Sequence, residues 1–165
     1  MIIILMGVSG AGKTTVGRSL ATQLGWPFFE GDDFHPSANI NKMMRGEPLT
    51  DSDRRPWLEE LHRLIIRLTQ QKSSALIACS ALKQAYRDYL KTGAQVRFVY
   101  LKGSPSLLRQ RLQQRQRHYM QANMLESQLN ILDEPQDALT IDTDQPIEKI
   151  LQVITESLFL VQKSE

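Results

Sequence analysis

The feature that most constrains this chain is a glycine-rich segment near its start, at residues 7–14. It reads Gly-Val-Ser-Gly-Ala-Gly-Lys-Thr and matches the pattern G-x-x-x-x-G-K-[ST] at every fixed position. The apolar run Ile2–Met6 precedes it. Val16, Leu20 and Leu24 follow it at the spacing of one helix face. This pattern requires a strand before the loop and a helix after it, so the sequence predicts a phosphate-binding loop in an α/β domain.

Each residue type in this loop has a physical task. Glycines permit a tight turn and let backbone N–H groups approach phosphate oxygens. The helix that follows adds the positive end of its dipole at the same point. Lys13 is expected to contact the β- and γ-phosphates of ATP and to act in catalysis, and Thr14 to coordinate Mg²⁺. The predicted nucleotide-binding residues of the loop are Gly7, Val8, Ser9, Gly10, Ala11, Gly12, Lys13, Thr14 and Thr15.

Short apolar runs and helical patterns alternate along the rest of the chain. Runs that are nearly continuous in Ile, Val, Leu and Ala are typical of strands covered on both faces. Strands that alternate with helices predict a three-layer α/β/α domain with a parallel sheet, here a single domain over residues 1–165. The expected strands are Ile2–Met6, Pro27–Glu30, Ala75–Cys79, Val96–Leu101 and Ala138–Ile141.

Helix ends have signals of their own. Gly25 is the expected end of the first helix. Thr50 and Asp53 have the spacing of a capping box. Ser104-Pro105 and Pro146 are expected to start the two helices that follow the last two strands, since proline suits the first helical position.

Composition limits the classes of function. A chain of 165 residues with 41% hydrophobic residues suits one compact domain. Its net charge of +2 is too small to indicate nucleic-acid binding, and no stretch reaches the roughly 20 apolar residues that span a bilayer. The single cysteine, Cys79, cannot form an internal disulfide. We therefore expect a cytoplasmic protein without nucleic-acid or membrane partners.

The loop alone does not name the phosphoryl acceptor, because several enzyme classes use it. A GTPase needs a guanine-reading element such as Asn-Lys-x-Asp, and residues 41–44 lack its aspartate and lie too early. The size of the chain favours a small-molecule kinase. Two alternatives stay open: a shikimate-type kinase, whose own acceptor motifs are not found here, and a nucleotide-binding protein without turnover.

Acidic residues follow the second expected strand, where ligands bind in an open parallel sheet. Glu30, Asp32 and Asp33 would face the same crevice as the loop. One carboxylate of the Asp32–Asp33 pair is expected to accept the proton of an attacking hydroxyl or to hold Mg²⁺ through water, while Asp33 is the better candidate for capping the next helix. His35 could contact substrate, although a histidine in such a place more often only bonds to the loop.

Basic residues supply candidates for binding an anionic acceptor. Arg54 and Arg55 lie at a helix start, where the dipole disfavours cations unless an anion compensates, so one of them is a candidate. Lys83 and Arg87 follow the third strand and could bind the same anion. The alternative there is a plain helix start, with Ser80 as its cap and Lys83 in solvent.

A polar, arginine-rich stretch at about residues 111–124 is a candidate lid. Arg111 and Arg115 share a helix face, and mobile arginines can stabilise the charge of phosphoryl transfer when a lid closes. Arg111 and Arg115 are therefore candidates for stabilising the transferred charge, and Arg115 is our candidate for a catalytic role. A solvated basic face is the alternative. Nucleic-acid binding is less favoured, because only Tyr119 lies nearby as an aromatic side chain.

Nearly the whole chain resembles the bacterial gluconate kinases. The loop is generic, but Gly-Asp-Asp-x-His-Pro from Gly31 and Asp-Arg-x-Pro-Trp from Asp53 are specific to that family. Two positions depart from its pattern: Glu30 replaces a common aspartate, and Arg117 replaces a glycine before His118. The segments that carry the resemblance are 7–14, 31–36, 38–43, 46–51, 53–58, 79–83, 86–88, 100–103 and 142–146.

The resemblance implies a fold like that of nucleoside monophosphate kinases, with strand order 2-3-1-4-5. It implies transfer of the ATP γ-phosphate to the 6-hydroxyl of D-gluconate, and a homodimer. By position, Asp32 becomes the contact of the acceptor hydroxyl, and Arg117 has no assigned role. The resemblance also implies that Arg111 and Arg115 bind the nucleotide, as lid residues on its phosphates or on the adenine side. The residues implied to hold the sugar acid are His35, Arg55, Lys83 and Arg87, together with Asp32.

Overall fold

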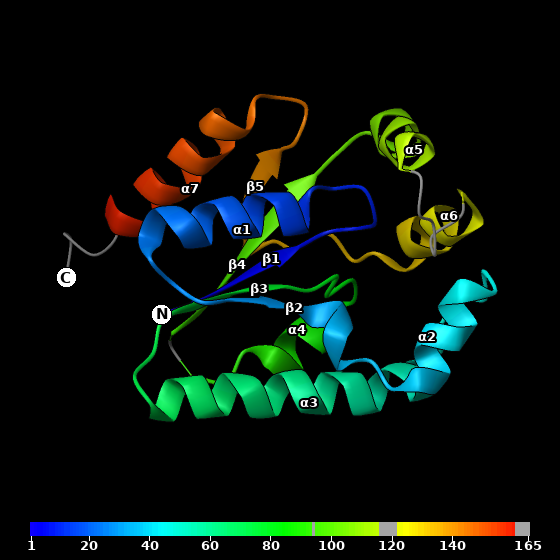
Figure 1. Cartoon of the computed structure of the whole chain (residues 1–165), viewed down its shortest axis with the longest axis horizontal. Coiled ribbons are helices and arrows are strands. Elements are labelled where there is room, and N and C mark those ends of the chain that lie inside the picture. The colour runs from blue at the N-terminus through cyan, green and yellow to red at the C-terminus, as the bar shows by residue number, and fades with distance from the viewer. Residues whose placement is uncertain (94, 116–121, 161–165) are drawn as a thin grey trace.

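In the computed structural model, which describes residues 1–93, 95–115 and 122–160, a parallel sheet lies between two layers of helices (Figure 1). The elements in chain order are β1 (Ile2–Met6), α1 (Lys13–Leu24), β2 (Phe28–Glu30), the 3-10 turn η1 (Gly31–Phe34), α2 (Ser37–Met44), α3 (Asp51–Gln70), β3 (Ala75–Ala78), α4 (Gln84–Leu90), β4 (Val96–Lys102), α5 (Pro105–Gln114), α6 (Ala122–Ile131), β5 (Leu139–Asp142) and α7 (Ile147–Leu160).

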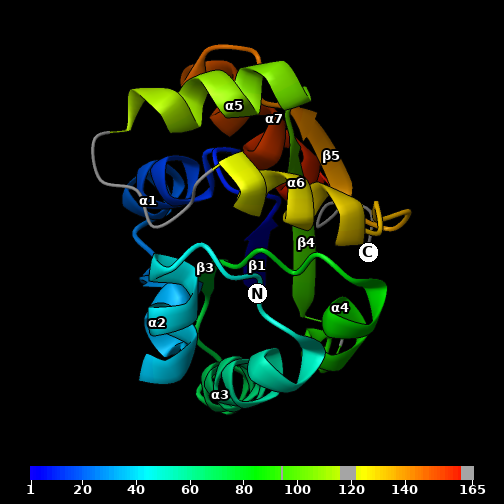
Figure 2. The same ribbon diagram turned by 90° about the vertical axis from the view of Figure 1, so that its right-hand side faces the viewer.

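The sheet has the order β2-β3-β1-β4-β5, which confirms the topology implied by the resemblance. The expected strands differ from the observed ones by at most one residue at an end. Strand β1 lies in the middle, where Ile2 pairs with Ala75 of β3 and with Val96 of β4. All pairs are parallel, so the carboxyl ends of the strands meet at one edge. Both views place α2, α5 and α6 at that edge (Figures 1 and 2).

Strand β1 is buried on both faces, as its unbroken apolar sequence predicts. Ile2, Ile4 and Met6 pack into the core formed with α3 and α4. Ile3 and Leu5 point the other way, into the core formed with α1 and α7. The alternation follows from the two-residue period of a strand, and it holds the start of the glycine-rich loop rigidly between two cores.

Three expected helix ends are confirmed. Gly25 ends α1 in a left-handed conformation with φ 68°. The Thr50 hydroxyl accepts from the Asp53 amide and the Asp53 carboxylate accepts from the Thr50 amide, which completes a capping box at the start of α3. Ser104 caps α5, with Pro105 in its first turn.

One expectation about local structure, and one alternative that the sequence left open, are wrong. Asp33 does not cap α2, because the chain first makes the turn η1 and α2 then begins after Pro36, without a side-chain cap. Ser80 is not the cap of the next helix either, since α4 starts only at Gln84. Ser80 is therefore left in the loop that follows β3. No helix in the described part of the chain is long and apolar enough to cross a membrane.

Candidate functional site

The phosphate loop joins β1 to α1 at the carboxyl edge of the sheet. Gly12 has φ 96°, a left-handed conformation that side chains disfavour, and it directly precedes the first turn of α1. The Lys13 ammonium donates to the Val8 carbonyl at 3.0 Å, so it lies folded back over the loop. Burial lowers the pKa of Lys13, and the carboxylates of Asp32 and Glu30 oppose that effect. The loop therefore holds a partly desolvated cation where phosphate oxygens would bind.

Thr14 is tied to the end of β2. Its hydroxyl donates to the Glu30 carboxylate at 2.6 Å. Burial raises the pKa of Glu30, and the neighbouring charge of Asp32 adds to this, while the bond from Thr14 opposes it. A hydroxyl and a carboxylate are hard oxygen ligands of the kind that Mg²⁺ prefers, so these two side chains fit a magnesium ion shared with nucleotide phosphates.

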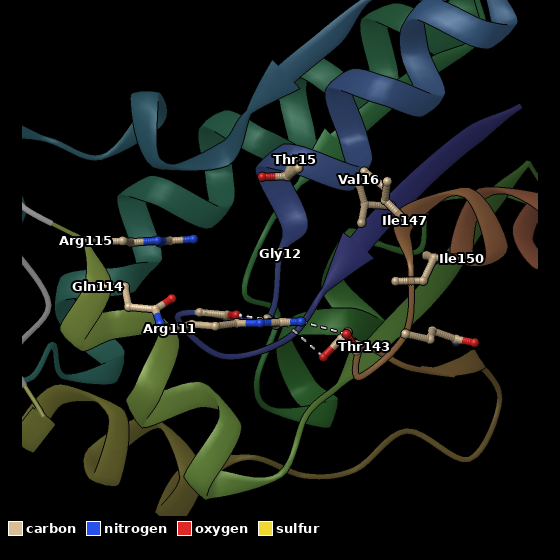
Figure 3. A pocket seen from close by; sticks show the side chains of 12 residues that line it. Gly12, Thr15, Val16, Arg111, Gln114, Arg115, Thr143, Ile147 and Ile150 are labelled. Carbon is tan, nitrogen blue, oxygen red and sulfur yellow. Dashed lines mark hydrogen bonds between the residues drawn. The ribbon is translucent and has the colours of Figure 1, made fainter.

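A cavity of about 360 Å³ opens on one side of the loop, and we call it the outer pocket. Figure 3 shows Arg111 of α5 and Arg115, which directly follows α5, on one side of it and apolar side chains of α1 and α7 on the other. Its lining combines the charge and the apolar surface that a nucleotide needs. The lining residues are Gly10, Ala11, Gly12, Thr15, Val16, Arg111, Gln114, Arg115, Thr143, Gln145, Ile147 and Ile150.

Arg111 and Arg115, the two arginines predicted to bind nucleotide, both line the outer pocket (Figure 3). The Arg111 guanidinium is held by the Thr143 carbonyl at 2.6 Å and by the Gly10 carbonyl at 3.3 Å. It therefore joins α5 to the phosphate loop and to the loop after β5. Arg115 is exposed at the end of α5, and its charge contributes to lowering the pKa of Lys13.

The expected lid is only partly described. Helix α5 ends at Gln114 and α6 begins at Ala122. Arg117 and His118 lie outside the described residues.

A second cavity is lined by Lys13 itself, and we call it the inner pocket. It is small, about 40 Å³, and brings together side chains from seven separate parts of the chain. Lys13 and Asp32 both line it, so the cation of the phosphate loop and the candidate base face one space. The lining residues are Ser9, Lys13, Asp32, His35, Met43, Leu49, Arg54, Trp57, Ser80, Leu82, Met124 and Gln128.

His35 forms a wall of the inner pocket. Its ring stacks on Trp57 with centroids 4.4 Å apart and planes at 11°, and its Nε2 lies 3.9 Å from the Asp32 carboxylate. Trp57 is itself fixed by a 2.7 Å bond from its indole N–H to the Gly31 carbonyl. Burial lowers the pKa of His35 to about 4, with Asp32 opposing and Arg54 reinforcing the shift. His35 is therefore neutral near neutral pH.

Of the two arginines at the start of α3, Arg54 lines the inner pocket and Arg55 does not. Arg54 is 9% exposed and donates to the Leu49 carbonyl at 2.7 Å, with its guanidinium 5.8 Å from the Tyr86 ring centroid. Arg55 is exposed on the next face of the helix. Neighbouring residues on a helix point about 100° apart, so only one of the pair can face the pocket.

Lys83 and Arg87 do not line the inner pocket either. The Lys83 ammonium pairs with the Asp51 carboxylate at 2.9 Å. Arg87 is 2% exposed, and its guanidinium donates to the carbonyls of Ala81 and Asp133 at 2.8 and 2.7 Å. These partners tie α4 to the loops beside it, which is a structural task.

Gln128 had no distinguishing sequence pattern. It lies on α6, is 7% exposed, and its side-chain oxygen accepts from the Ser9 amide of the phosphate loop at 2.8 Å. Met124, one turn earlier, packs with Met43 of α2 and with Leu49 over the inner pocket. A glutamine or methionine on a helix face is too common to mark a site, and no signal short of the fold could have found them.

Comparison with known proteins agrees with this geometry. Residues 9–159 match the family model described as Shikimate kinase. The chain is 42% identical to a probable gluconokinase of Xenopus tropicalis, over 93% of this chain and 91% of that protein. It is 43% identical to the thermoresistant gluconokinase of Escherichia coli, over 91% of this chain and 89% of that protein.

Solved structures show the same relationship. A gluconokinase from Sinorhizobium meliloti superposes with a TM-score of 0.81 at 40% identity, covering 96% of this chain and 95% of that one. A sugar kinase from Janibacter gives a TM-score of 0.86 at 40% identity, over 93% and 91% of the two chains. A shikimate kinase from Aquifex aeolicus gives 0.65 at 18% identity over the full length of both chains, and that likeness shows the fold alone.

Proposed function

This chain belongs to the gluconokinases, within the broader shikimate kinase family of P-loop kinases, and we propose that it transfers the γ-phosphate of ATP to the 6-hydroxyl of D-gluconate. The products are ADP and 6-phospho-D-gluconate. One observation carries the proposal beyond the family: Lys13 of the phosphate loop and Asp32 at the end of β2 line one pocket. A phosphoryl group bound at the loop would face a hydroxyl held beside that carboxylate.

The roles of the donor side follow from the loop and the outer pocket. The base and ribose of ATP would occupy the outer pocket, and the loop amides with Lys13 would hold the phosphates. Thr14, oriented by Glu30, would bind Mg²⁺, which neutralises charge on the β- and γ-phosphates when present. Arg115 would approach the transferred group from the end of α5, adding positive charge where the transition state is negative.

The acceptor side uses a different set of residues. Asp32 would accept the proton of the attacking hydroxyl, and Arg54 would pair with the carboxylate of the sugar acid. We replace Arg55 by Arg54 and leave out Lys83 and Arg87, because the charged groups of those three residues lie away from the pocket.

The inner pocket as it stands is too small for a sugar acid. Access would therefore require α2 and α6 to separate where Met43 and Met124 pack together. The same contact would re-form over the bound acceptor and exclude water, which is needed to keep the phosphoryl group from hydrolysis.

The proposal extends to a homodimer and to a cytoplasmic location. The dimer follows from the family resemblance. The location is supported by the one cysteine, Cys79, which is buried and free.

A coupled assay of ADP release tests the function. Gluconate, shikimate and a nucleoside monophosphate are offered separately with ATP and Mg²⁺, and mass spectrometry identifies the phosphorylated product. We expect turnover with gluconate and a product phosphorylated at the 6-hydroxyl. Turnover with shikimate but not gluconate would overturn the proposal, and ATP binding without turnover of any acceptor would indicate a protein that only binds nucleotide.

A further inference from the structure

We propose that the buried side chain of Asn39 holds His35 in the tautomer protonated at Nε2, so that His35 serves the inner pocket as an N–H donor and not as a base. Asn39 lies in the first turn of α2, is 3% exposed and does not line the pocket. It is therefore a positioning residue that acts through His35. The inference rests on the proposed function for its kinetic consequence only.

The orientation of the Asn39 amide is decided by a backbone carbonyl. Its Nδ2 lies 2.7 Å from the Asp53 oxygen, which can only accept a hydrogen bond. Turning the amide over would bring two acceptor oxygens together at that distance, so the NH₂ group must face Asp53. The same Nδ2 lies 3.2 Å from His35 Nδ1, so its second hydrogen is available to that nitrogen.

This contact determines which nitrogen of His35 carries the proton. An amide NH₂ donates only, so His35 Nδ1 must accept, and a neutral ring then has its hydrogen on Nε2. A ring turned over by 180° would keep its stacking on Trp57 but place a carbon where Nδ1 stands, and the hydrogen bond from Asn39 would be lost. The contact with Asn39 therefore favours the observed orientation of the ring. Burial and the charge of Arg54 keep the ring neutral.

The tautomer determines which of His35 and Asp32 can act as the base and which can only donate a hydrogen bond. The lone pair of Nδ1 is used by Asn39, and Nε2 has none available, so His35 cannot take a proton from the acceptor hydroxyl. Its Nε2–H lies toward Asp32, at 3.9 Å from the carboxylate, and can donate to an oxygen bound between them. Asp32 is then the base of the pair, and His35 orients the acceptor.

Nitrogen-15 NMR of the full chain without ligand tests the tautomer directly. The chain has three histidines, so His62→Gln and His118→Gln leave the His35 signals identified. We expect a proton on Nε2 and none on Nδ1. Asn39→Asp puts an acceptor beside Nδ1 and should move the proton to that nitrogen, whereas Asn41→Asp, an equal charge change at an exposed position of the same helix, should not. A wild-type spectrum with Nδ1 protonated, or no change in Asn39→Asp, overturns the proposal.

Two variants of His35 test the kinetic consequence. The amide nitrogen of glutamine can reach the place of Nε2, while that of asparagine reaches only the place of Nδ1. We expect His35→Gln to lower kcat/KM for gluconate a few-fold and His35→Asn about tenfold, the range of one hydrogen bond. Equal losses of about a hundredfold or more in both would instead indicate a base and overturn the proposal. Absence of gluconate turnover in the wild type would refute the proposed function but leave the NMR result standing.

Discussion

The hydroxyl of Thr14 donates a 2.6 Å hydrogen bond to the carboxylate of Glu30, which joins the start of α1 to the end of β2. A hydroxyl has one hydrogen and two lone pairs. Because the hydrogen is used by Glu30, the lone pairs remain to face a cation at the phosphate loop. The longer glutamate, which stands where the family commonly has aspartate, therefore still reaches the loop.

Replacing Glu30 should weaken Mg²⁺ binding. Glu30→Ala leaves the Thr14 hydroxyl without its acceptor, and we expect the Mg²⁺ concentration for half-maximal activity to rise roughly tenfold, as for other residues that orient metal ligands. The measurement is a Mg²⁺ titration at saturating ATP and gluconate. Glu148→Ala, which removes an exposed carboxylate on α7, is the control. An unchanged Mg²⁺ requirement in Glu30→Ala would contradict this role.

Asp32 and Asp33 are neighbours of the same type, but only Asp32 lines the inner pocket. Asp32→Asn removes the proposed base without changing its size, and kcat should fall more than tenfold. Asp33→Asn should change kcat little, since that side chain is exposed and outside the pocket. Steady-state kinetics of both variants at saturating substrates make the comparison, and near-normal kcat in Asp32→Asn would refute its role.

Arg54 and Arg55 form a second matched pair. Arg54→Gln should raise KM for gluconate about tenfold or more while KM for ATP stays near the wild-type value, because a charge-assisted bond to the acceptor is lost. Arg55→Gln should leave both values near wild type. Thermal unfolding of Arg54→Gln is needed as well, since the arginine also bonds to the Leu49 carbonyl. The reverse order of effects would restore Arg55 as the acceptor-binding residue.

His35 should make folding stability depend on pH. Its pKa is about 4 in the folded chain against an ordinary value of 6.5, so the unfolded chain binds a proton first as pH falls. The free energy of unfolding therefore has its full value above pH 6.5 and decreases as the pH falls toward 4. The expected decrease by pH 4 is about 3 kcal/mol. Urea unfolding between pH 4 and 8 should show this loss.

The loss should shrink in His35→Gln, which cannot take up a proton. His62→Gln, which removes a less buried histidine on α3, is the control and should keep the wild-type dependence. A His35→Gln curve parallel to the wild type would show that another group causes the effect.

Local features were predictable from sequence because neighbouring residues determine them. The phosphate loop needs only its own glycines, Lys13 and Thr14 between a strand and a helix. The cap at Gly25 and the capping box of Thr50 and Asp53 also depend on residues a few positions apart. Strand β1 was recognisable because burial on both faces demands an unbroken apolar run.

The composition of the inner pocket depended on the tertiary structure. Gln128 reaches Ser9 across 119 positions of the chain, and no local pattern records such a contact. Which of Arg54 and Arg55 faces the pocket was decided only by the orientation of α3 against the sheet. The sequence made Arg87 a candidate for binding an anion. In the fold, its guanidinium instead donates hydrogen bonds to the backbone carbonyls of Ala81 and Asp133.

The sequence by itself therefore determined the donor half of this protein, since the phosphate loop is one continuous segment whose backbone makes the site. Tertiary structure decided the acceptor half. Its side chains come from separate elements, and whether each faces the pocket, the solvent or another partner depends on how those elements pack. Asn39 shows this most plainly, because its effect on His35 is set by a carbonyl of α3, fourteen positions away.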